Sequence, residues 1–238
     1  MDPVFFVGAG PGDPGLITVK GLSLLESADL LMYTGSLVNP DLVERSRAAE
    51  KLDSHGMTHE EIISRLETAA KDGKKVVRLH SGDPSLYGAM IEQILALEDR
   101  GIPSAVVPGV SSLFAAAAAL RTQLTLKGVS ESLVITRPAG KTLDEDRIPD
   151  LSALGETLAI FLGGDRISDV VVKLRCPPET PAAVIYHASW DDEKVVRGTV
   201  ADIGKRAEEA GIHKTALIIV GKVVEPRSSG FRRSHLYP

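Results

Sequence analysis

The first half of the chain alternates short apolar runs with longer amphipathic stretches. Runs with the length and composition of buried strands occur at residues 4–7, 29–33, 75–80 and 104–107. Stretches with helical spacing and helix-end signals lie at residues 16–26, 58–73, 85–99 and 112–120. Because strands that alternate with helices pair in parallel, this half is predicted to be an α/β domain with a mainly parallel sheet.

The second half has both element types in a different order. Strands are predicted at residues 133–136, 157–161, 182–186, 194–197 and 216–220, and helices at residues 165–174 and 200–210. The segment 190–193 between two of these strands is typical of a hairpin turn, so this sheet is predicted to be mixed. Residues 122–130 lack a helical face, and residues 136–154 are rich in Pro, Gly and charge. We therefore predict two α/β domains, residues 1–116 and 117–238.

Three loops rich in small residues follow strands of the first half. They span residues 8–13, 81–84 and 108–112. Gly82 would let a ligand approach the backbone, Asp83 offers a carboxylate at the helix start, and Pro84 would set the first helical turn. Since parallel sheets bind ligands at the carboxyl ends of their strands, we expect the loops to converge on one crevice. Helix punctuation without a ligand is the alternative.

The residue types in these loops favour positioning over proton transfer. They expose backbone donors and acceptors, which suits group transfer from a cofactor that brings the reactive group. A nicotinamide or flavin dinucleotide is disfavoured, because Asp13 stands where the fingerprint needs glycine and Pro11 lacks an amide hydrogen. A tight turn with no ligand stays open for that loop.

Charge and cysteine content limit the binding partners and the cellular compartment that we expect for this protein. Lysine and arginine number 27 against 32 acidic residues, and the net charge of -5 does not favour binding to nucleic acid or an anionic membrane. No apolar run approaches the ~20 residues that cross a bilayer, and the amino terminus has no secretory pattern. Cys176 is the only cysteine, so no internal disulfide can form, which fits a cytoplasmic protein.

Neither a metal site nor a hydrolase triad is predicted. His55 and His59 stand four residues apart, but Gly56 interrupts any helix between them, and no third ligand has motif spacing. The motif Gly-x-Ser-x-Gly is absent, and neither Ser111 nor Ser112 has a sequence-linked histidine and acid.

Four segments, taken in order, resemble the tetrapyrrole methylases, the family that modifies uroporphyrinogen and the precorrins with S-adenosylmethionine. The segments are VGAGPGDP at 7–14, GDP at 82–84 with Tyr87 and Gly88, VPGVSS at 107–112 and ALIIVG at 216–221. The resemblance covers nearly the whole chain. It implies the two-domain class III methyltransferase fold, a homodimer, S-adenosylmethionine as methyl donor in the cleft between the domains, and a tetrapyrrole (precorrin) substrate beside it.

Carried over residue by residue, the resemblance implies contacts with the methyl donor. They fall on Pro11, Ser81, Gly82, Asp83, Leu86, Tyr87, Ser111, Ser112, Leu162, Ala188 and Ala216. All but the last three lie in or beside the loops that the residue types alone single out. Leu162, Ala188 and Ala216 rest on the resemblance, and ordinary strand-end packing is their alternative.

Within the family, a closer similarity is to the branch that methylates precorrin-4, with or without cobalt, at ring carbon eleven. It rests on residues 33–38, 78–83, 188–190, 195–197 and 236–237. Some relatives that methylate uroporphyrinogen carry an aspartate where this chain has Thr34 and Gly35, so no general base is assigned. The alternatives are a sibling methylase of another precorrin or uroporphyrinogen, and a nucleotide- or corrinoid-binding module without catalysis.

The carboxylates of such a substrate are expected to meet basic side chains. The candidates are Arg78, His80, Arg121, Arg137 and Arg197.

Overall fold

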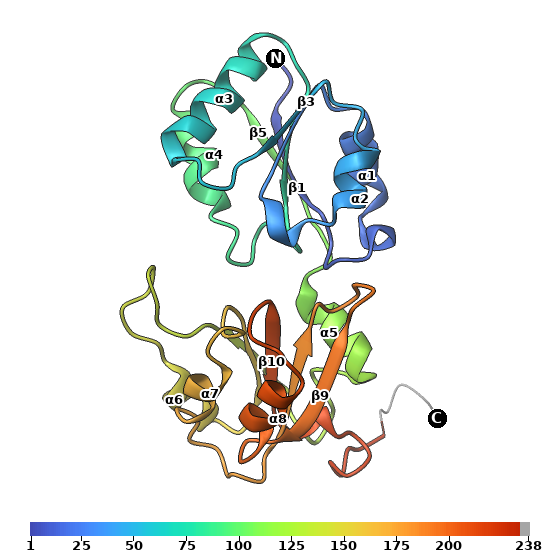
Figure 1. Ribbon diagram of the computed structural model, residues 1–238, viewed down its shortest axis with the longest axis vertical. Coiled ribbons are helices and arrows are strands. Elements are labelled where there is room, and N and C mark those ends of the chain that lie inside the picture. The colour runs from blue at the N-terminus through green and yellow to red at the C-terminus, as the bar shows by residue number, and fades with distance from the viewer. Residues whose placement is uncertain (234–238) are drawn as a thin grey trace. The chain divides into compact units, whose positions relative to one another are not determined.

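The computed structural model describes residues 1–233, so Leu236 and Tyr237, which contributed to the resemblance, lie outside the described part. The chain forms two compact units, Met1–Ser112 and Leu113–Pro238. Figure 1 shows that each unit is a sheet flanked by helices. The domain limits of 1–116 and 117–238 stay a prediction.

All five strands of the first unit are parallel, as the sequence pattern predicts. The order is β3-β2-β4-β1-β5, with β1 at Val4–Gly8, β2 at Leu30–Tyr33, β3 at Glu50–Asp53, β4 at Val76–His80 and β5 at Ser104–Val107. After β1 the chain continues to β2, which lies on the β4 side of β1. After β4 it continues to β5, which lies on the opposite side of β1. The carboxyl ends of β1 and β4 therefore flank a topological switch point, where open α/β sheets bind ligands.

Helices cover both faces of this sheet (Figure 1). One face carries α1 (Val19–Glu26) and α2 (Pro40–Arg45), and the other carries α3 (His59–Lys71) and α4 (Met90–Glu98). Successive side chains of a strand point to opposite faces, so Val7 packs toward α1 and α2 while Phe6 packs toward α3 and α4. Thr58 and Glu61 form a capping box at the start of α3, where the sequence pattern predicts a helix start.

Two 3-10 turns and a short edge strand account for most differences from the expected boundaries of helices and strands in the first unit. The predicted helix at 16–26 is divided into a 3-10 turn, η1 (Pro14–Leu16), and α1, for which Thr18 is the N-cap. Another 3-10 turn, η2 (Gly35–Leu37), follows β2. Strand β3 was not predicted, because this edge strand reads EKLD and has only one apolar side chain.

The predicted start of the fourth helix is wrong. We expected a helix over 85–99, with Asp83 at its start and Pro84 in its first turn, but α4 starts at Met90. Tyr87 has a φ of 56°, a left-handed conformation that an α-helix does not contain. The segment before α4 is therefore a loop.

The second unit has a mixed sheet, as predicted. Its order is β6-β7-β10-β8-β9, with β6 at Leu133–Thr136, β7 at Thr157–Ile160, β8 at Pro181–Tyr186, β9 at Lys194–Thr199 and β10 at Ala216–Val220. Strands β6 and β7 are parallel, whereas β10 is antiparallel to β7 and β8, and β8 is antiparallel to β9. The segment between β8 and β9 thus forms the predicted hairpin turn.

Helices again cover both faces of the second sheet. One face packs against α5 (Ser112–Leu120) through Leu217 and Ile219, and the 3-10 turn η3 (Lys222–Val224) adds to this core. The opposite face packs through Ile218 and Val184 against α6 (Ile148–Ser152), α7 (Ile167–Val171) and α8 (Ile203–Glu209). The predicted boundary between residues 116 and 117 falls inside α5.

Among the helices of residues 1–233, none combines the length and apolarity that crossing a membrane requires.

Candidate functional site

The loops after β1 and β4 are joined by backbone hydrogen bonds. The amide of Ala9 donates to the carbonyl of His80 over 2.7 Å. Gly10 and Gly82 exchange a pair of hydrogen bonds of 2.8 and 3.2 Å, and their φ values of 83° and 61° lie in the left-handed region that favours glycine. Two of the three predicted loops therefore form one continuous rim.

The third loop, after β5, joins this rim through contact between glycine backbones. A Cβ atom placed on Gly8 would lie 2.5 Å from the Cα of Gly109 and 2.7 Å from the carbonyl oxygen of Gly82. A Cβ on Gly109 would lie 2.7 Å from the Cα of Gly8. Real Cβ atoms do not approach this closely, so all three loops meet only because these positions lack side chains.

Asp83 links two of the loops through its carboxylate. Its Oδ2 accepts a hydrogen bond of 2.8 Å from the amide of Gly109, and its Oδ1 accepts bonds from the amide and hydroxyl of Ser85. Partial burial opposes ionisation, but these bonds outweigh it and lower the pKa of Asp83. An anionic Asp83 is therefore the polar anchor of the rim.

The backbone beyond Asp83 turns sharply. Tyr87 and Ala89 have φ values of 56° and 47°, and a Cβ on Gly88 would collide with the carbonyl of Pro84. Such left-handed, non-glycine conformations cost of order 1–3 kcal/mol each, so surrounding contacts must hold them. The turn leaves Tyr87 with 43% of its surface exposed.

The remaining first-unit candidates lie on the same rim. Pro11 follows Gly10, and the next carbonyl, that of Gly12, accepts a hydrogen bond of 2.9 Å from Asn39. Ser111 and Ser112 are 3.7 and 3.8 Å from the place that a Gly82 Cβ would occupy. The structure thus brings these loops together, as expected from the carboxyl ends of parallel strands.

In the second unit, Leu162, Ala188 and Ala216 gather at one edge of the sheet. Leu162 follows β7, Ala188 follows β8, and Ala216 begins β10, which is antiparallel to both strands. Ala216 pairs with the last residue of β8, and a Cβ on Gly164 would lie 2.7 Å from the Ala216 nitrogen. These three residues were expected from the family resemblance alone, and the fold makes them neighbours.

Backbone strain gathers at the predicted residues. The described non-glycine residues with positive φ are Tyr87, Ala89, Arg121, Leu162, His187, Ser189 and Thr215. Two of the seven are predicted site residues, and three more adjoin Ala188 or Ala216. Strained conformations cluster at ligand sites, so this distribution favours a binding role over plain strand-end packing. Sequence offers no signal for it, because none of these residues is glycine.

Two candidate basic residues are buried behind the first-unit rim. Burial, reinforced by the nearby Arg78, lowers the pKa of His80 to about 3, so His80 is neutral near pH 7 and cannot meet a carboxylate as a cation. Burial also lowers the pKa of Arg78 to about 10, against the charge of Asp53, and Arg78 stays cationic. Its guanidinium donates to Gln93 and to Thr34, both over 3.2 Å.

The other basic candidates have different surroundings. The guanidinium of Arg197 donates to the backbone carbonyls of Val224 and Leu120, so two of its donor groups are used within the second unit. Arg137 donates to the hydroxyl of Thr142 over 2.6 Å. Arg121 is exposed.

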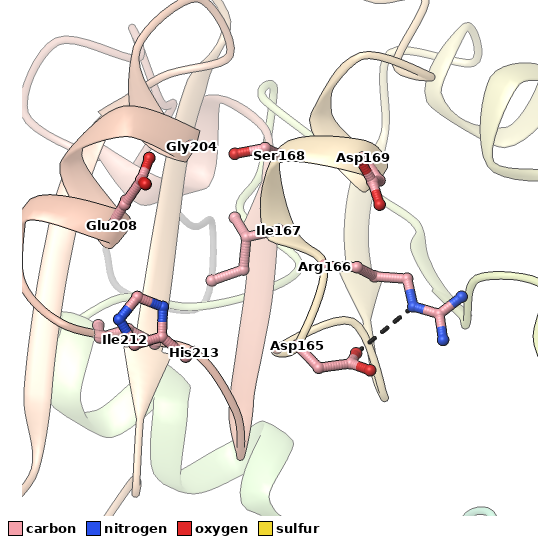
Figure 2. Close-up of a pocket in the computed structure, with 10 residues that line it drawn as sticks. Asp165, Arg166, Ile167, Ser168, Asp169, Gly204, Glu208, Ile212 and His213 are labelled. Carbon is pink, nitrogen blue, oxygen red and sulfur yellow. Dashed lines mark ion pairs between the residues drawn. The ribbon is translucent and has the colours of Figure 1, made fainter.

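A separate cavity of about 250 Å³ lies in the second unit between α7 and α8 (Figure 2). Its polar lining includes Asp165, Asp169, Glu208 and His213, and Arg166 forms an ion pair of 3.5 Å with Asp165. No predicted site residue lines it. Within residues 1–233, no three His, Cys, Asp or Glu side chains are placed to hold a metal ion.

Comparisons with known proteins identify the family of the chain. The family model of the Tetrapyrrole (Corrin/Porphyrin) Methylases matches residues 3–204. The cobalt-precorrin-4 C(11)-methyltransferase of Methanocaldococcus jannaschii is 53% identical over 94% of this chain and 89% of its own length.

Two solved structures are also similar. One, described as a cobalamin biosynthetic enzyme, cobalt precorrin-4 methyltransferase, has a TM-score of 0.90 and 40% identity over 94% of this chain and 96% of its own. The other, uroporphyrin-III C-methyltransferase of Thermus thermophilus in complex with S-adenosylhomocysteine, has a TM-score of 0.82 and 30% identity over 94% of this chain and 100% of its own.

The low pKa of His80 predicts a specific acid sensitivity. The unfolded chain takes up a proton on this imidazole below pH 6.5, whereas the folded chain stays neutral there down to about pH 3. Stability therefore falls as pH decreases through this window, by at most about 1.4 kcal/mol per pH unit from this group. His80→Gln should lose less unfolding free energy than wild type between pH 7 and pH 4 in urea titrations followed by circular dichroism.

The control is His213→Gln, at an exposed histidine of the second unit. It should follow the wild-type curve, because this substitution keeps the buried His80 and all three proteins have the same carboxylates. A parallel decline of wild type and His80→Gln would contradict the neutral, buried His80.

Proposed function

Because the chain belongs to the tetrapyrrole (corrin/porphyrin) methylase family, we propose that it transfers a methyl group from S-adenosylmethionine to ring carbon eleven of precorrin-4 or cobalt-precorrin-4. The products are precorrin-5, or its cobalt form, and S-adenosylhomocysteine. The enzyme is thus an S-adenosylmethionine-dependent methyltransferase of cobalamin biosynthesis. The observation that carries this function is its near full-length similarity to enzymes of that name.

We propose that the methyl donor contacts both groups of strained loops. In the first unit the contacts fall on Pro11, Ser81, Gly82, Asp83, Leu86, Tyr87, Ser111 and Ser112, and in the second unit on Leu162, Ala188 and Ala216. Glycine at positions 82 and 109 leaves the backbone of the first rim uncovered at these two positions, so its backbone groups can approach a ligand. The strain at and beside these residues also supports a binding role.

The chemistry requires orientation more than acid–base assistance. The sulfonium donor supplies an activated methyl group. An electron pair of carbon eleven forms the new C–C bond while the S–CH3 bond breaks and its electrons stay on sulfur. The loops must hold carbon, methyl and sulfur nearly in line at ~3–3.5 Å, which can account for ~7–11 kcal/mol of the barrier.

Turnover of precorrin-4 with methyl-labelled S-adenosylmethionine tests the function directly. We expect the label at carbon eleven in the NMR spectrum of the product. A label at another carbon, or transfer to uroporphyrinogen and not to precorrin-4, would identify a sibling methylase. Binding of S-adenosylhomocysteine without transfer to any tetrapyrrole would favour a binding module.

Asp83→Ala should weaken binding of S-adenosylhomocysteine measured by calorimetry. The substitution removes the acceptor of the Gly109 and Ser85 hydrogen bonds, so the loop after β5 loses its anchor. Hydrogen bonds to charged groups contribute about 1.5–3 kcal/mol, so we expect roughly tenfold to hundredfold weaker binding. Asp150→Ala is the matched control, because Asp150 is exposed and makes one surface ion pair. Wild-type affinity in a folded Asp83→Ala protein would refute the assignment of this loop.

We also propose a homodimer in the cytoplasm. The resemblance implies the dimer, and α4 supports it, because Ile91 and Leu95 lie one turn apart and are 58% and 53% exposed. The cytoplasm agrees with the single cysteine of the sequence, Cys176, which can form no internal disulfide.

Leu95→Glu should shift the chain from dimer to monomer in sedimentation velocity, because it places a charge in the proposed contact. Leu154→Glu, at an exposed residue of the second unit, should leave the dimer intact. A dimeric Leu95→Glu protein would exclude this face, and a monomeric wild type would exclude the dimer.

A further inference from the structure

His187 lies at the second-unit edge where the proposed donor contacts gather. It follows the last residue of β8 and precedes Ala188, and its amide donates to the carbonyl of Thr215, beside Ala216, over 3.3 Å. Its side chain is 18% exposed, so it is only partly buried. No role was assigned to this histidine from the sequence.

The hydrogen bond of His187 determines which ring nitrogen can act. Its Nδ1 lies 2.8 Å from Oδ1 of Asp192. This hydrogen bond is the main cause of a lowered pKa of Asp192, so the carboxylate is ionised and can only accept. Nδ1 therefore carries a hydrogen, and in the neutral form of the imidazole this leaves the lone pair on Nε2. A carboxylate that holds an imidazole in this tautomer is the arrangement that general bases use.

Aromatic rings hold the imidazole in place. The His187 ring stacks on Tyr186 with centroids 3.8 Å apart and planes at 16°, and Trp190 lies on it at 5.2 Å. Neighbouring residues of a strand normally point to opposite faces. Here a φ of 47° at His187 brings its ring onto the ring of Tyr186. Strain at this position is thus associated with a defined ring orientation.

We propose that Nε2 of His187 is the base that removes the proton released when carbon eleven is methylated, an inference that rests on the proposed function. Attack by carbon eleven uses a π electron pair of the macrocycle. The charge of the methylated ring therefore increases by one. Loss of one ring proton to Nε2 returns that charge to the imidazole, which releases the proton to water after turnover. The balance is substrate plus sulfonium donor giving methylated product, thioether and one proton.

The charges around the imidazole suit this step. Asp192 offsets the positive charge that His187 gains, and Glu193 accepts the Ser189 amide over 2.7 Å. Lys194 lies 5.9 Å from the centre of the Tyr186 ring, on the adjoining strand β9. Partial desolvation and then the charge of Asp192 raise the pKa of Tyr186, so the phenol stays neutral.

The test compares wild type with His187→Ala, His187→Asn and Asp192→Asn. Asparagine can still donate to Asp192 from the position of Nδ1, but it has no basic nitrogen. His213→Ala is the matched control, at an exposed histidine of the same unit. For each protein, kcat with precorrin-4 is measured against pH and with added imidazole, and the affinity for S-adenosylhomocysteine is measured by calorimetry.

We expect kcat of His187→Ala and His187→Asn to fall by about 10²–10⁴-fold, the usual contribution of a general base. Their affinity for S-adenosylhomocysteine should stay near wild type. Added imidazole should restore part of the His187→Ala rate, and the acid limb of the kcat profile should disappear in both variants. Asp192→Asn should retain more activity than either, because the base itself remains.

Wild-type kcat in His187→Asn would overturn the proposal, since it would show that only the contact with Asp192 matters. If His187→Ala does not fold, the unchanged acid limb of His187→Asn would overturn it equally. A wild type that binds S-adenosylhomocysteine but methylates no precorrin-4 would instead overturn the proposed function, and the base with it.

Discussion

Close contact between the backbones of Gly8, Gly82 and Gly109 is the constraint on which the rim of the first unit depends. The three loops meet where any Cβ at Gly8 or Gly109 would collide with a neighbouring main chain. This packing is possible only at the carboxyl ends of adjacent parallel strands, which bring the loops to one edge. A rim built from backbone has few ionisable groups, and its chemistry is therefore positioning.

In the second unit, candidate residues also gather at one edge of a sheet, but the strand directions and the turns differ. Its strands are mostly antiparallel, so the starts and ends of β7, β8 and β10 share one edge. Gly164 packs closely against Ala216 at this edge, but the left-handed positions of the turns are the non-glycine residues Leu162, His187 and Thr215. Such strain persists only when surrounding packing enforces it. The buried strand β7 and the buried centre of β8, with Ala159 and Val184 at 0% exposure, supply that packing.

Much of this could be predicted from the sequence, because the relevant signals are local. Glycine-rich loops after apolar runs placed the first rim, and the strand-helix rhythm predicted the parallel sheet. The turn before α4 could not be predicted, because Tyr87 and Ala89 adopt conformations that their residue types disfavour. Asp83 looked like a helix cap, and its bond to Gly109 became visible only when residues 26 positions apart met in the fold. The pairing of His187 with Asp192 was missed because the intervening segment looked like a solvated hairpin tip.

His80 and His187 both lie at strand ends, but they differ in burial and in the charge of their neighbours. His80 is 7% exposed, stands beside the cationic Arg78 and is kept neutral, so it can pack and hydrogen-bond but cannot hold a proton near neutral pH. His187 is partly exposed and stands beside the anionic Asp192, whose Oδ1 lies 2.8 Å from its Nδ1. Under the proposed function, this difference in burial and in the sign of the neighbouring charge makes His187, and not His80, the histidine that is suited to accept the proton of methyl transfer.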